Sequence, residues 1–400
     1  MEVNGPLDSL SPKNQPLPVE KILCITNDFG PRAGGIETFI IGLIERLPKN
    51  SVIVYTSAQD KSSDYDQQWF ENYGVEVIRD KARILLPTPG VAFCISSLIR
   101  ERGITTAFFG AAAPLALLSW SIRRAGITRI IALTHGHEVW WSRLWPFTIA
   151  MKFISRRVDH LTYLGEFTRT AISRAIDKSA QSAMVKIAPG IDTDHFAPVD
   201  STDLKKTLGL IDKRVIVSVG RLVHRKGQDS LIEAMPQVLQ KIPNAHLVLI
   251  GEGPYRGYLE GRAKSLQIDS HITFIGRIAH AELPRYICVG EIFAMPSRSR
   301  FAGLEVEGLG IVYLEASACA LPVIAGNSGG APDAVLDGDT GLVVDGRDVS
   351  AVARSIEKLL LDQKRARDMG LRGREWVIDQ WRWQIWAERF ASLLKGKPLI

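Results

Sequence analysis

Residues 215–229 read VIVSVGRLVHRKGQD, an apolar run that ends at a glycine and continues into a basic loop. The β-branched run predicts a buried strand, and the apolar spacing over residues 231–239 predicts a helix after the loop. Arg221 and Lys226 then lie at the carboxyl end of a strand, where open parallel α/β sheets bind their ligands. Two cations there suit a diphosphate, because arginine forks onto two oxygens and lysine supplies a point charge. The alternative is a solvated basic turn.

Short apolar strands alternate with helical stretches along the rest of the chain. We expect strands at residues 21–26, 51–56, 106–109, 129–134 and 160–163, and again at 214–219, 245–251, 272–276, 291–294 and 322–325. This alternation is typical of two doubly wound α/β sheets. Pro189, Gly190 and Pro198 punctuate the chain between the two series, so we place a domain boundary there. The predicted divisions are a leader at 1–20, a first domain at 21–193, a second domain at 194–373 and a final segment at 374–400. We expect a single helix over about residues 374–394 of that segment.

The composition is ordinary for a soluble protein, with 400 residues of which 46% are hydrophobic and 23% charged. That length supports two domains with a core each. The four cysteines show no Cys-x-x-Cys spacing, which fits a reducing cytoplasm. The first 20 residues carry four prolines and lack the order of a signal peptide, so we predict a disordered leader. The uncharged residues 104–122 have the length of a membrane span, but their Thr, Gly and Pro predict a strand, a turn and a helix instead.

Two glutamates eight positions apart, Glu307 and Glu315, flank a glycine turn that predicts the start of a helix. If the whole stretch were helical, they would lie roughly 12 Å apart, at a rise of about 1.5 Å per residue. A nucleotide sugar can span such a pair, with its hexose near Glu307 and its ribose near Glu315. Its diphosphate would then lie over the free amides of Gly310, Ile311 and Val312. The alternative is a loop glutamate followed by a solvated helix glutamate.

Together with Arg221 and Lys226, this Glu-x7-Glu pair resembles the signature of the retaining glycosyltransferases of GT-B architecture. The resemblance implies two Rossmann-like domains whose parallel sheets face each other across a cleft, and a C-terminal helix at 374–400 that crosses back to the first domain. It covers nearly the whole chain. Further motifs are similar to those of the GDP-mannose-dependent phosphatidylinositol mannoside mannosyltransferases. These motifs are TNDF at 26–29, FGAAAPL at 109–115, THGHE at 134–138 and AGNSGGAP at 325–332.

This resemblance implies a reaction and its catalytic residues. A hexose, mannose from GDP-mannose, passes to a hydroxyl of a phosphatidylinositol mannoside-type glycolipid with retention of configuration. Arg221 and Lys226 stabilise the negative charge on the leaving diphosphate. Glu307 and a histidine after the strand at 129–134 contact the transferred sugar. We favour His135, with His137 as one alternative and a buried structural histidine as another.

The remaining assignments concern the donor and the acceptor. Gly34 and Gly35, after the first strand, let the backbone approach the diphosphate or the acceptor, or simply form a turn. Asp28 orients an acceptor hydroxyl, and Arg277 lies near the nucleotide base. Because no carboxylate is placed as a nucleophile, we expect an acceptor hydroxyl to attack from the face that the diphosphate leaves. A phosphate oxygen would take its proton.

We expect neither a metal nor a tightly bound cofactor. The Asp-x-Asp patterns at 192–194 and 337–339 match the metal motif of another glycosyltransferase class. Both lie in predicted turns, where aspartates bond to nearby backbone amides. The eight histidines show no zinc-binding spacing.

A lipid acceptor implies contact with a membrane surface. The net charge of +6 and the aromatic stretch WWSRLWP at 140–146, followed by three cations, suit an anionic leaflet. The apolar residues around the following helix favour burial instead, as a lid or core element. We expect a cytoplasmic protein, peripheral on the inner face of the cytoplasmic membrane, with no nucleic-acid partner.

Other functions stay open at this point. A sugar-nucleotide epimerase shares the two-domain cleft, and a UDP- or ADP-sugar glycosyltransferase with a soluble acceptor shares the signature. A non-catalytic nucleotide-binding protein would more naturally have lost one of the three charged residues Arg221, Lys226 and Glu307. A nicotinamide oxidoreductase would need a complete Gly-x-Gly-x-x-Gly opening, which neither first strand-helix unit supplies.

Overall fold

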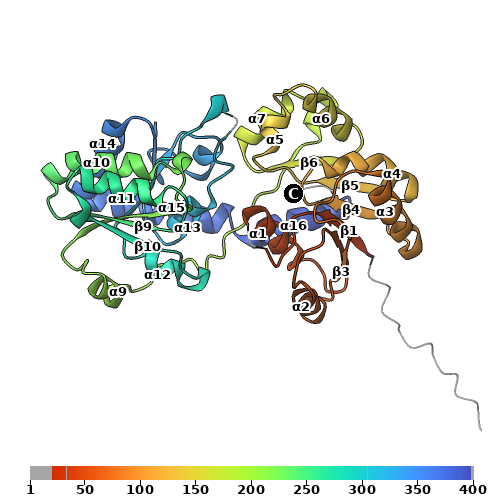
Figure 1. Ribbon diagram of the computed structural model, residues 1–400, viewed down its shortest axis with the longest axis horizontal. Helices are drawn as coiled ribbons and strands as arrows, with labels where there is room; N and C mark the ends of the chain where they lie inside the picture. The colour runs from red at the N-terminus through yellow and green to blue at the C-terminus, as the bar shows by residue number, and fades with distance from the viewer. Residues whose placement is uncertain (1–19, 33, 304, 398–400) are drawn as a thin grey trace, which may run out of the picture.

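The computed structural model describes residues 20–32, 34–303 and 305–397, and these form two α/β domains side by side (Figure 1). The disordered leader expected at 1–20 lies outside the described residues except for Glu20. We call the sheet β1–β7 with its helices and α16 the first domain, and the sheet β8–β13 with α9–α15 the second domain. The predicted boundary at 193 stays a prediction.

The first domain is built on a seven-stranded parallel sheet in the order β3-β2-β1-β4-β5-β6-β7. Its central strands are buried on both faces, as parallel sheets covered by helices require. The strands are β1 (Ile22–Thr26), β2 (Val52–Thr56), β3 (Glu76–Arg79), β4 (Thr106–Phe109), β5 (Arg129–Ala132), β6 (His160–Tyr163) and β7 (Val185–Lys186). The helices are α1 (Gly35–Ile44), α2 (Ser63–Tyr73), α3 (Pro89–Arg102), η1 (Leu115–Leu118), α4 (Ser119–Ala125), α5 (Glu138–Trp141), α6 (Phe147–Ser155), α7 (Glu166–Ser173) and α8 (Lys178–Ser182).

The second domain is built on a six-stranded parallel sheet in the order β10-β9-β8-β11-β12-β13. The strands are β8 (Arg214–Val219), β9 (Ala245–Ile250), β10 (Ile272–Gly276), β11 (Ile292–Met295), β12 (Val323–Gly326) and β13 (Gly341–Val344). The helices are α9 (Thr202–Thr207), η2 (His224–Lys226), α10 (Gln228–Lys241), α11 (Arg256–Ser265), η3 (Asp269–His271), η4 (His280–Glu282), α12 (Leu283–Ile287), η5 (Phe301–Gly303), α13 (Ile311–Ala318), η6 (Ala331–Ala334), α14 (Val349–Leu361) and α15 (Gln363–Gln380).

The ten predicted strands are confirmed, each to within two residues at its ends. The sequence did not predict β3, β7 and β13. Every residue of β3 is only partly buried, β7 has two residues, and the middle of β13 is partly exposed. None of the three presents the continuous buried run that marks strands such as β1 and β11.

The single helix predicted at 374–394 is wrong, because the chain forms two helices there. α15 ends at Gln380, Trp381 leaves the helical range with a φ of −126°, and α16 (Trp383–Leu394) begins two residues later. α16 crosses to the first domain, where it lies beneath the sheet (Figure 1) and contacts α1 and β5. The rings of Phe390 and Phe108 meet edge to face at 5.1 Å between their centroids. The last helix therefore supplies part of the first core.

The uncharged stretch at 104–122 forms β4, η1 and the first turn of α4. Over the ranges that the structure describes, no helix has the length and apolar character needed to cross a bilayer.

Candidate active site

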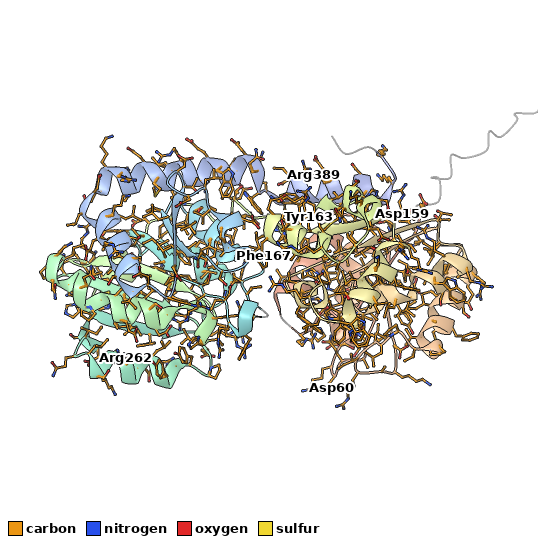
Figure 2. The ribbon with its side chains drawn as sticks, turned by 90° about the horizontal axis from the view of Figure 1, so that it is seen from above. Asp60, Asp159, Tyr163, Phe167, Arg262 and Arg389 are labelled. Atoms are coloured by element: carbon orange, nitrogen blue, oxygen red, sulfur yellow. The ribbon has the colours of Figure 1, made fainter. Side chains whose placement is uncertain are left out.

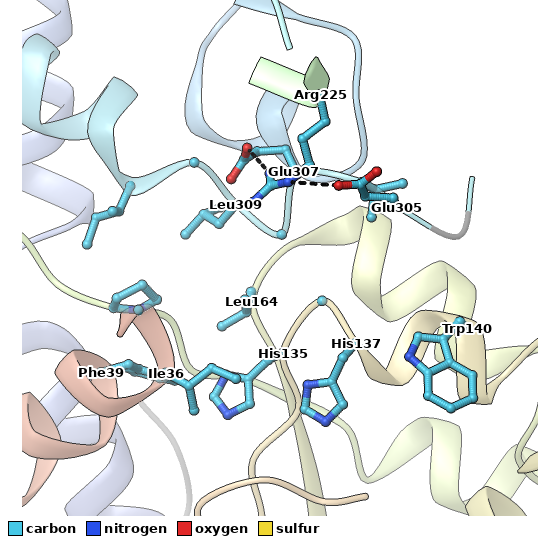
Figure 3. Close-up of a pocket in the computed structure, with 17 residues that line it drawn as sticks. Ile36, Phe39, His135, His137, Trp140, Leu164, Arg225, Glu305, Glu307 and Leu309 are labelled. Atoms are coloured by element: carbon cyan, nitrogen blue, oxygen red, sulfur yellow. Dashed lines mark hydrogen bonds and ion pairs between the residues drawn. The ribbon is translucent and has the colours of Figure 1, made fainter. Parts of the chain in front are cut away.

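A cavity of about 520 Å³ opens between the two domains, and both contribute to its wall (Figure 3). The first domain provides the start of α1 and the segment after β5, while the second provides the turn η2 and the loop before α13. The lining residues are Gly35, Ile36, Phe39, His135, Gly136, His137, Trp140, Leu164 and Pro189 from the first domain side and Arg225, Glu305, Val306, Glu307, Gly308, Leu309, Gly310 and Ile311 from the second.

The buried carboxylate of Glu307 joins two cations on the second-domain side. Its Oε2 lies 2.8 Å from Lys226 Nζ and 2.7 Å from Arg225 Nη1. Burial alone would raise the pKa of Glu307, but the adjacent charges of Lys226 and Arg225 outweigh it and hold the pKa below its ordinary value. Glu307 is therefore ionised at neutral pH and holds both cations, Arg225 in the cavity wall and Lys226 outside its lining.

The turn that carries these cations is fixed by a second charged group behind it. The backbone N–H of Arg298 donates to the Arg225 carbonyl at 2.8 Å, and the Arg298 guanidinium pairs with the buried carboxylate of Asp229. Gly227 follows the turn with a φ of +76°, and a Cβ atom there would lie 2.1 Å from the Pro296 carbonyl oxygen. Only glycine fits this position. The roles of Arg225 and Arg298 could not be predicted from local sequence, because their partners lie 82 and 69 positions away along the chain.

The predicted helix start after Glu307 is confirmed. Gly310 adopts a φ of +76° as the residue before α13, which leaves the first amides of the helix without intrahelical partners. Gly310 and Ile311 line the cavity, whereas Val312 and Glu315 are buried within α13. Glu307 precedes the helix, so the spacing calculated for a continuous helix does not apply. Burial raises the pKa of Glu315 to about 7, and the charge of Lys226 opposes this shift.

His135 and His137 both line the cavity on the first-domain side. His135 Nε2 lies 2.7 Å from the Gly110 carbonyl oxygen, and since a carbonyl only accepts, this nitrogen carries the proton. Burial lowers the pKa of His135, with the charge of Glu138 opposing the shift, and the ring is therefore neutral at pH 7. The side chain of His137 is more accessible, at 34% exposure, and its Nε2 lies 3.2 Å from Glu138 Oε1. Either ring reaches the cavity, and the preference for His135 stays a prediction.

The two glycines after β1 have different settings. Gly35 begins α1 and lines the cavity, while Gly34 precedes the helix. A Cβ atom on Gly34 would lie 2.2 Å from Oε2 of the buried Glu37, so a glycine leaves the room that this carboxylate occupies. Asp28 and Glu37 share a partner, since Arg32 Nη2 lies 3.5 Å from Asp28 Oδ1 and 3.0 Å from Glu37 Oε1. Burial and the charge of Glu37 raise the pKa of Asp28.

Not every predicted site residue reaches the cavity. Arg221 and Arg277 are exposed near the ends of β8 and β10 and do not line the cavity wall. Asp28, Gly34 and Lys226 do not line it either, although Lys226 contacts Glu307. Their donor- and acceptor-binding roles stay predictions. Within the described ranges, no group of three or more His, Cys, Asp or Glu side chains is arranged to hold a metal ion.

Two family models match the chain, one for each domain. Glycosyltransferase Family 4 matches residues 33–195, and Glycosyl transferases group 1 matches residues 200–376. The GDP-mannose-dependent alpha-(1-6)-phosphatidylinositol monomannoside mannosyltransferase of Mycolicibacterium smegmatis is 44% identical, over 94% of this chain and 98% of the relative. A GDP-mannose-dependent monoacylated alpha-(1-6)-phosphatidylinositol monomannoside mannosyltransferase of Corynebacterium glutamicum is 40% identical, again over 94% of this chain and 98% of the relative.

Solved structures share the fold at low sequence identity. Anabaena HepE in complex with UDP has a TM-score of 0.79 at 18% identity, over 94% of this chain and all of HepE. The sucrose-phosphate synthase of Thermosynechococcus elongatus has a TM-score of 0.75 at 23% identity, over 94% of this chain and 99% of the synthase. The predicted GT-B architecture is confirmed. With a curated relative 44% identical over almost its whole length, the chain belongs to the group 1 glycosyltransferases.

Proposed function

We propose that the enzyme transfers mannose from GDP-mannose to a hydroxyl of phosphatidylinositol monomannoside, with retention of the anomeric configuration. The observation that carries this proposal is the convergence of Arg225, Glu307 and the free amides at the start of α13 on one cavity between the domains. Lys226 contacts the same Glu307 carboxylate from outside the cavity lining, at 2.8 Å. The names of relatives 40% to 44% identical support the choice of donor and acceptor.

The second domain holds the donor in this proposal. The diphosphate lies against Lys226 and the amides of Gly310 and Ile311, while Arg221 reaches it from the end of β8. As the bond between the anomeric carbon and the phosphate oxygen breaks, negative charge grows on the diphosphate, and these groups stabilise it. Arg225 and Lys226 also hold the carboxylate of Glu307 in place. This carboxylate then accepts hydrogen bonds from hydroxyl groups of the hexose.

The acceptor hydroxyl attacks the anomeric carbon from the face that the diphosphate leaves, and a phosphate oxygen takes its proton. Glu307 is a poor nucleophile for a double displacement, because two cations hold its carboxylate and depress its pKa. His135 or His137 contacts the transferred sugar from the first domain. Because Nε2 of the neutral His135 ring donates to Gly110, its Nδ1 can only accept a hydrogen bond from a sugar hydroxyl. Retention then follows from the geometry of the attack.

A lipid acceptor implies peripheral contact with an anionic membrane. The side chains of Leu144, Trp145 and Ile149, between α5 and the middle of α6, are exposed, and Trp145 reaches 79%. Lys152 and Arg156 pair with Asp177 on the same surface, so apolar contact carries more of this docking than charge does. The free thiols of Cys24, Cys94, Cys288 and Cys319 fit the reducing inner face of the cytoplasmic membrane.

A donor screen tests the proposal. GDP-mannose, UDP-glucose and ADP-glucose are offered with phosphatidylinositol monomannoside, while nucleotide release and the anomeric configuration of the product are measured. We expect an alpha product from GDP-mannose alone. Release of free sugar or an epimer without acceptor would indicate an epimerase, and turnover of a UDP- or ADP-sugar with a soluble glycan would indicate the other glycosyltransferase function.

Vesicle co-sedimentation tests the membrane contact separately. We expect the enzyme to sediment with vesicles that contain phosphatidylinositol and to lose most of this binding when Trp145 and Ile149 are both replaced by Ser. Equal sedimentation of the variant and the unaltered protein would exclude docking through this surface.

A further inference from the structure

Trp140 is a wall residue of the cavity rather than a surface anchor. It lies in α5 and lines the cavity together with His137 and Glu305. Figure 3 shows His135, His137 and Trp140 in a row on the first-domain side, with Glu305 and Glu307 on the opposite side. Trp145, five residues later, is the exposed tryptophan of this segment.

The indole of Trp140 is held in place from behind. Its ring centroid lies 4.9 Å from that of Phe147, edge to face, and 5.4 Å from that of Trp141. The short helix is anchored by the fully buried Glu138, whose Oε2 accepts the backbone N–H of His135 at 2.7 Å. An aromatic surface fixed in this way costs little conformational entropy when it binds a ligand.

A half-buried indole beside ionisable groups suits a saccharide. One face of a pyranose ring presents C–H groups that pack on an aromatic face, while its edge presents hydroxyls that need polar partners. Glu305 supplies such a partner: its side chain is 36% exposed, and its carboxylate is oriented by Arg300 at 3.2 Å. Binding pockets combine an apolar wall with a few polar groups in the same way.

The position of Trp140 at the end of the row formed with His135 and His137 indicates which sugar packs on it. In the proposed function, the donor hexose lies between Glu307 and the histidines. Trp140 lies beyond His137 from His135 (Figure 3). The exposed Leu144 and Trp145 follow it along the chain. A headgroup that reaches from a membrane into the cavity would therefore pass the indole before it meets the donor.

We propose that Trp140 is an acceptor-binding residue, on whose indole face the mannose ring of the acceptor packs. This inference rests on the proposed function, since it requires an acceptor that carries a sugar. The same surface selects acceptors with an exposed C–H face and disfavours unglycosylated phosphatidylinositol.

Steady-state kinetics of Trp140→Leu and Trp140→Phe test the inference. The acceptors are phosphatidylinositol monomannoside in vesicles and its deacylated, water-soluble headgroup. We expect Trp140→Leu to raise the KM for both acceptors roughly tenfold, because the stacking contact is lost. The KM for GDP-mannose should rise clearly less than the KM for either acceptor, and Trp140→Phe should restore most of the acceptor affinity.

Trp120→Leu is the matched control, because Trp120 is an exposed tryptophan on α4, away from the cavity wall. It is expected to leave every constant unchanged. If Trp140→Leu raised the KM for the lipid acceptor but not for the soluble headgroup, Trp140 would be a membrane anchor and the inference would be overturned. Equal rises in the KM for donor and acceptor would also overturn it. Failure of the proposed function shows differently, as unaltered enzyme that transfers no mannose to either acceptor.

Discussion

Gly136 and Gly308 meet across the cavity so closely that a Cβ atom on Gly136 would lie 3.2 Å from the Gly308 Cα atom. Gly136 follows β5 and Gly308 follows Glu307, so the two domains touch backbone to backbone beside the paired carboxylate. We expect Gly136→Ala to hold the domains apart and to lower kcat/KM by roughly tenfold to a hundredfold, because catalytic groups then miss their alignment. Steady-state kinetics and a thermal melt of the variant check this, and the melting temperature should not change.

Gly308→Ala is the matched variant for this contact. A Cβ atom on Gly308 would lie 3.8 Å from the Gly136 Cα atom, which is an ordinary van der Waals distance. Its effect on kcat/KM should be clearly smaller than that of Gly136→Ala. Equal losses in the two variants would contradict the explanation by crowding.

The Lys226→Ala variant tests the stabilisation of the leaving group. We expect kcat to fall roughly a hundredfold, because a positive charge beside the developing anion is lost. The fold should survive, since Arg225 still neutralises the buried Glu307. Turnover at saturating GDP-mannose and the melting temperature are the measurements, and unchanged turnover would remove Lys226 from the catalytic site. Arg221→Ala, measured in parallel, decides whether this exposed arginine binds the donor.

The buried Glu315 predicts a specific dependence of stability on pH. Its pKa is raised by burial to about 7, from 4.5 in the unfolded chain. Between these values the folded protein binds more protons than the unfolded chain, so the free energy of unfolding falls as pH rises. The stabilisation present at low pH is lost by about pH 7 and amounts to roughly 3 kcal/mol, at about 1.4 kcal/mol per pKa unit.

Glu315→Gln should not show this loss. We expect the melting temperature of the variant, relative to that of the unaltered protein, to rise from about pH 5 to about pH 7 and then stay constant. Melting both proteins across this range isolates the contribution of one carboxyl group. Parallel curves for the two proteins would mean that Glu315 is not protonated in the folded state at neutral pH.

Asp333 links the domains at a second point. Its Oδ2 accepts the backbone N–H of Phe167 at 3.1 Å, in the first turn of α7. Phe167 lies at the junction of the two domains (Figure 2). We expect Asp333→Ala to increase the radius of gyration and lower kcat/KM several-fold, because loss of such a cap costs about 1 kcal/mol. Small-angle scattering and kinetics measure both effects, with the exposed Asp60→Ala as control.

The buried strands and the strand-end residues could be predicted from the sequence alone. β1, β8 and β9 are mostly apolar, and nearly all of their residues are buried. His135 follows β5 and Lys226 follows β8, while Glu307 precedes the helix α13 that opens after Gly310. The local pattern therefore places each of them near the carboxyl edge of its own sheet.

The rest depends on contacts between distant parts of the chain. Arg225 pairs with a glutamate 82 positions away, and Arg298 lies 69 positions from Asp229. No local pattern marks either residue. Local sequence also does not predict which tryptophan of the segment after residue 139 lines the cavity. Trp140 lines it, whereas Trp145 faces the solvent. Trp140 packs against Phe147 and Trp141, whereas Trp145 is 79% exposed.

The return of α16 to the first domain has a consequence for biosynthesis. Trp383 fills the space left by Gly42 in α1, and the Leu393 carbonyl accepts from Arg129. These contacts form only after the whole second sheet has left the ribosome. The earlier part of the nascent chain must therefore wait with an incomplete core, exposed to aggregation and open to chaperones, until the last helix arrives.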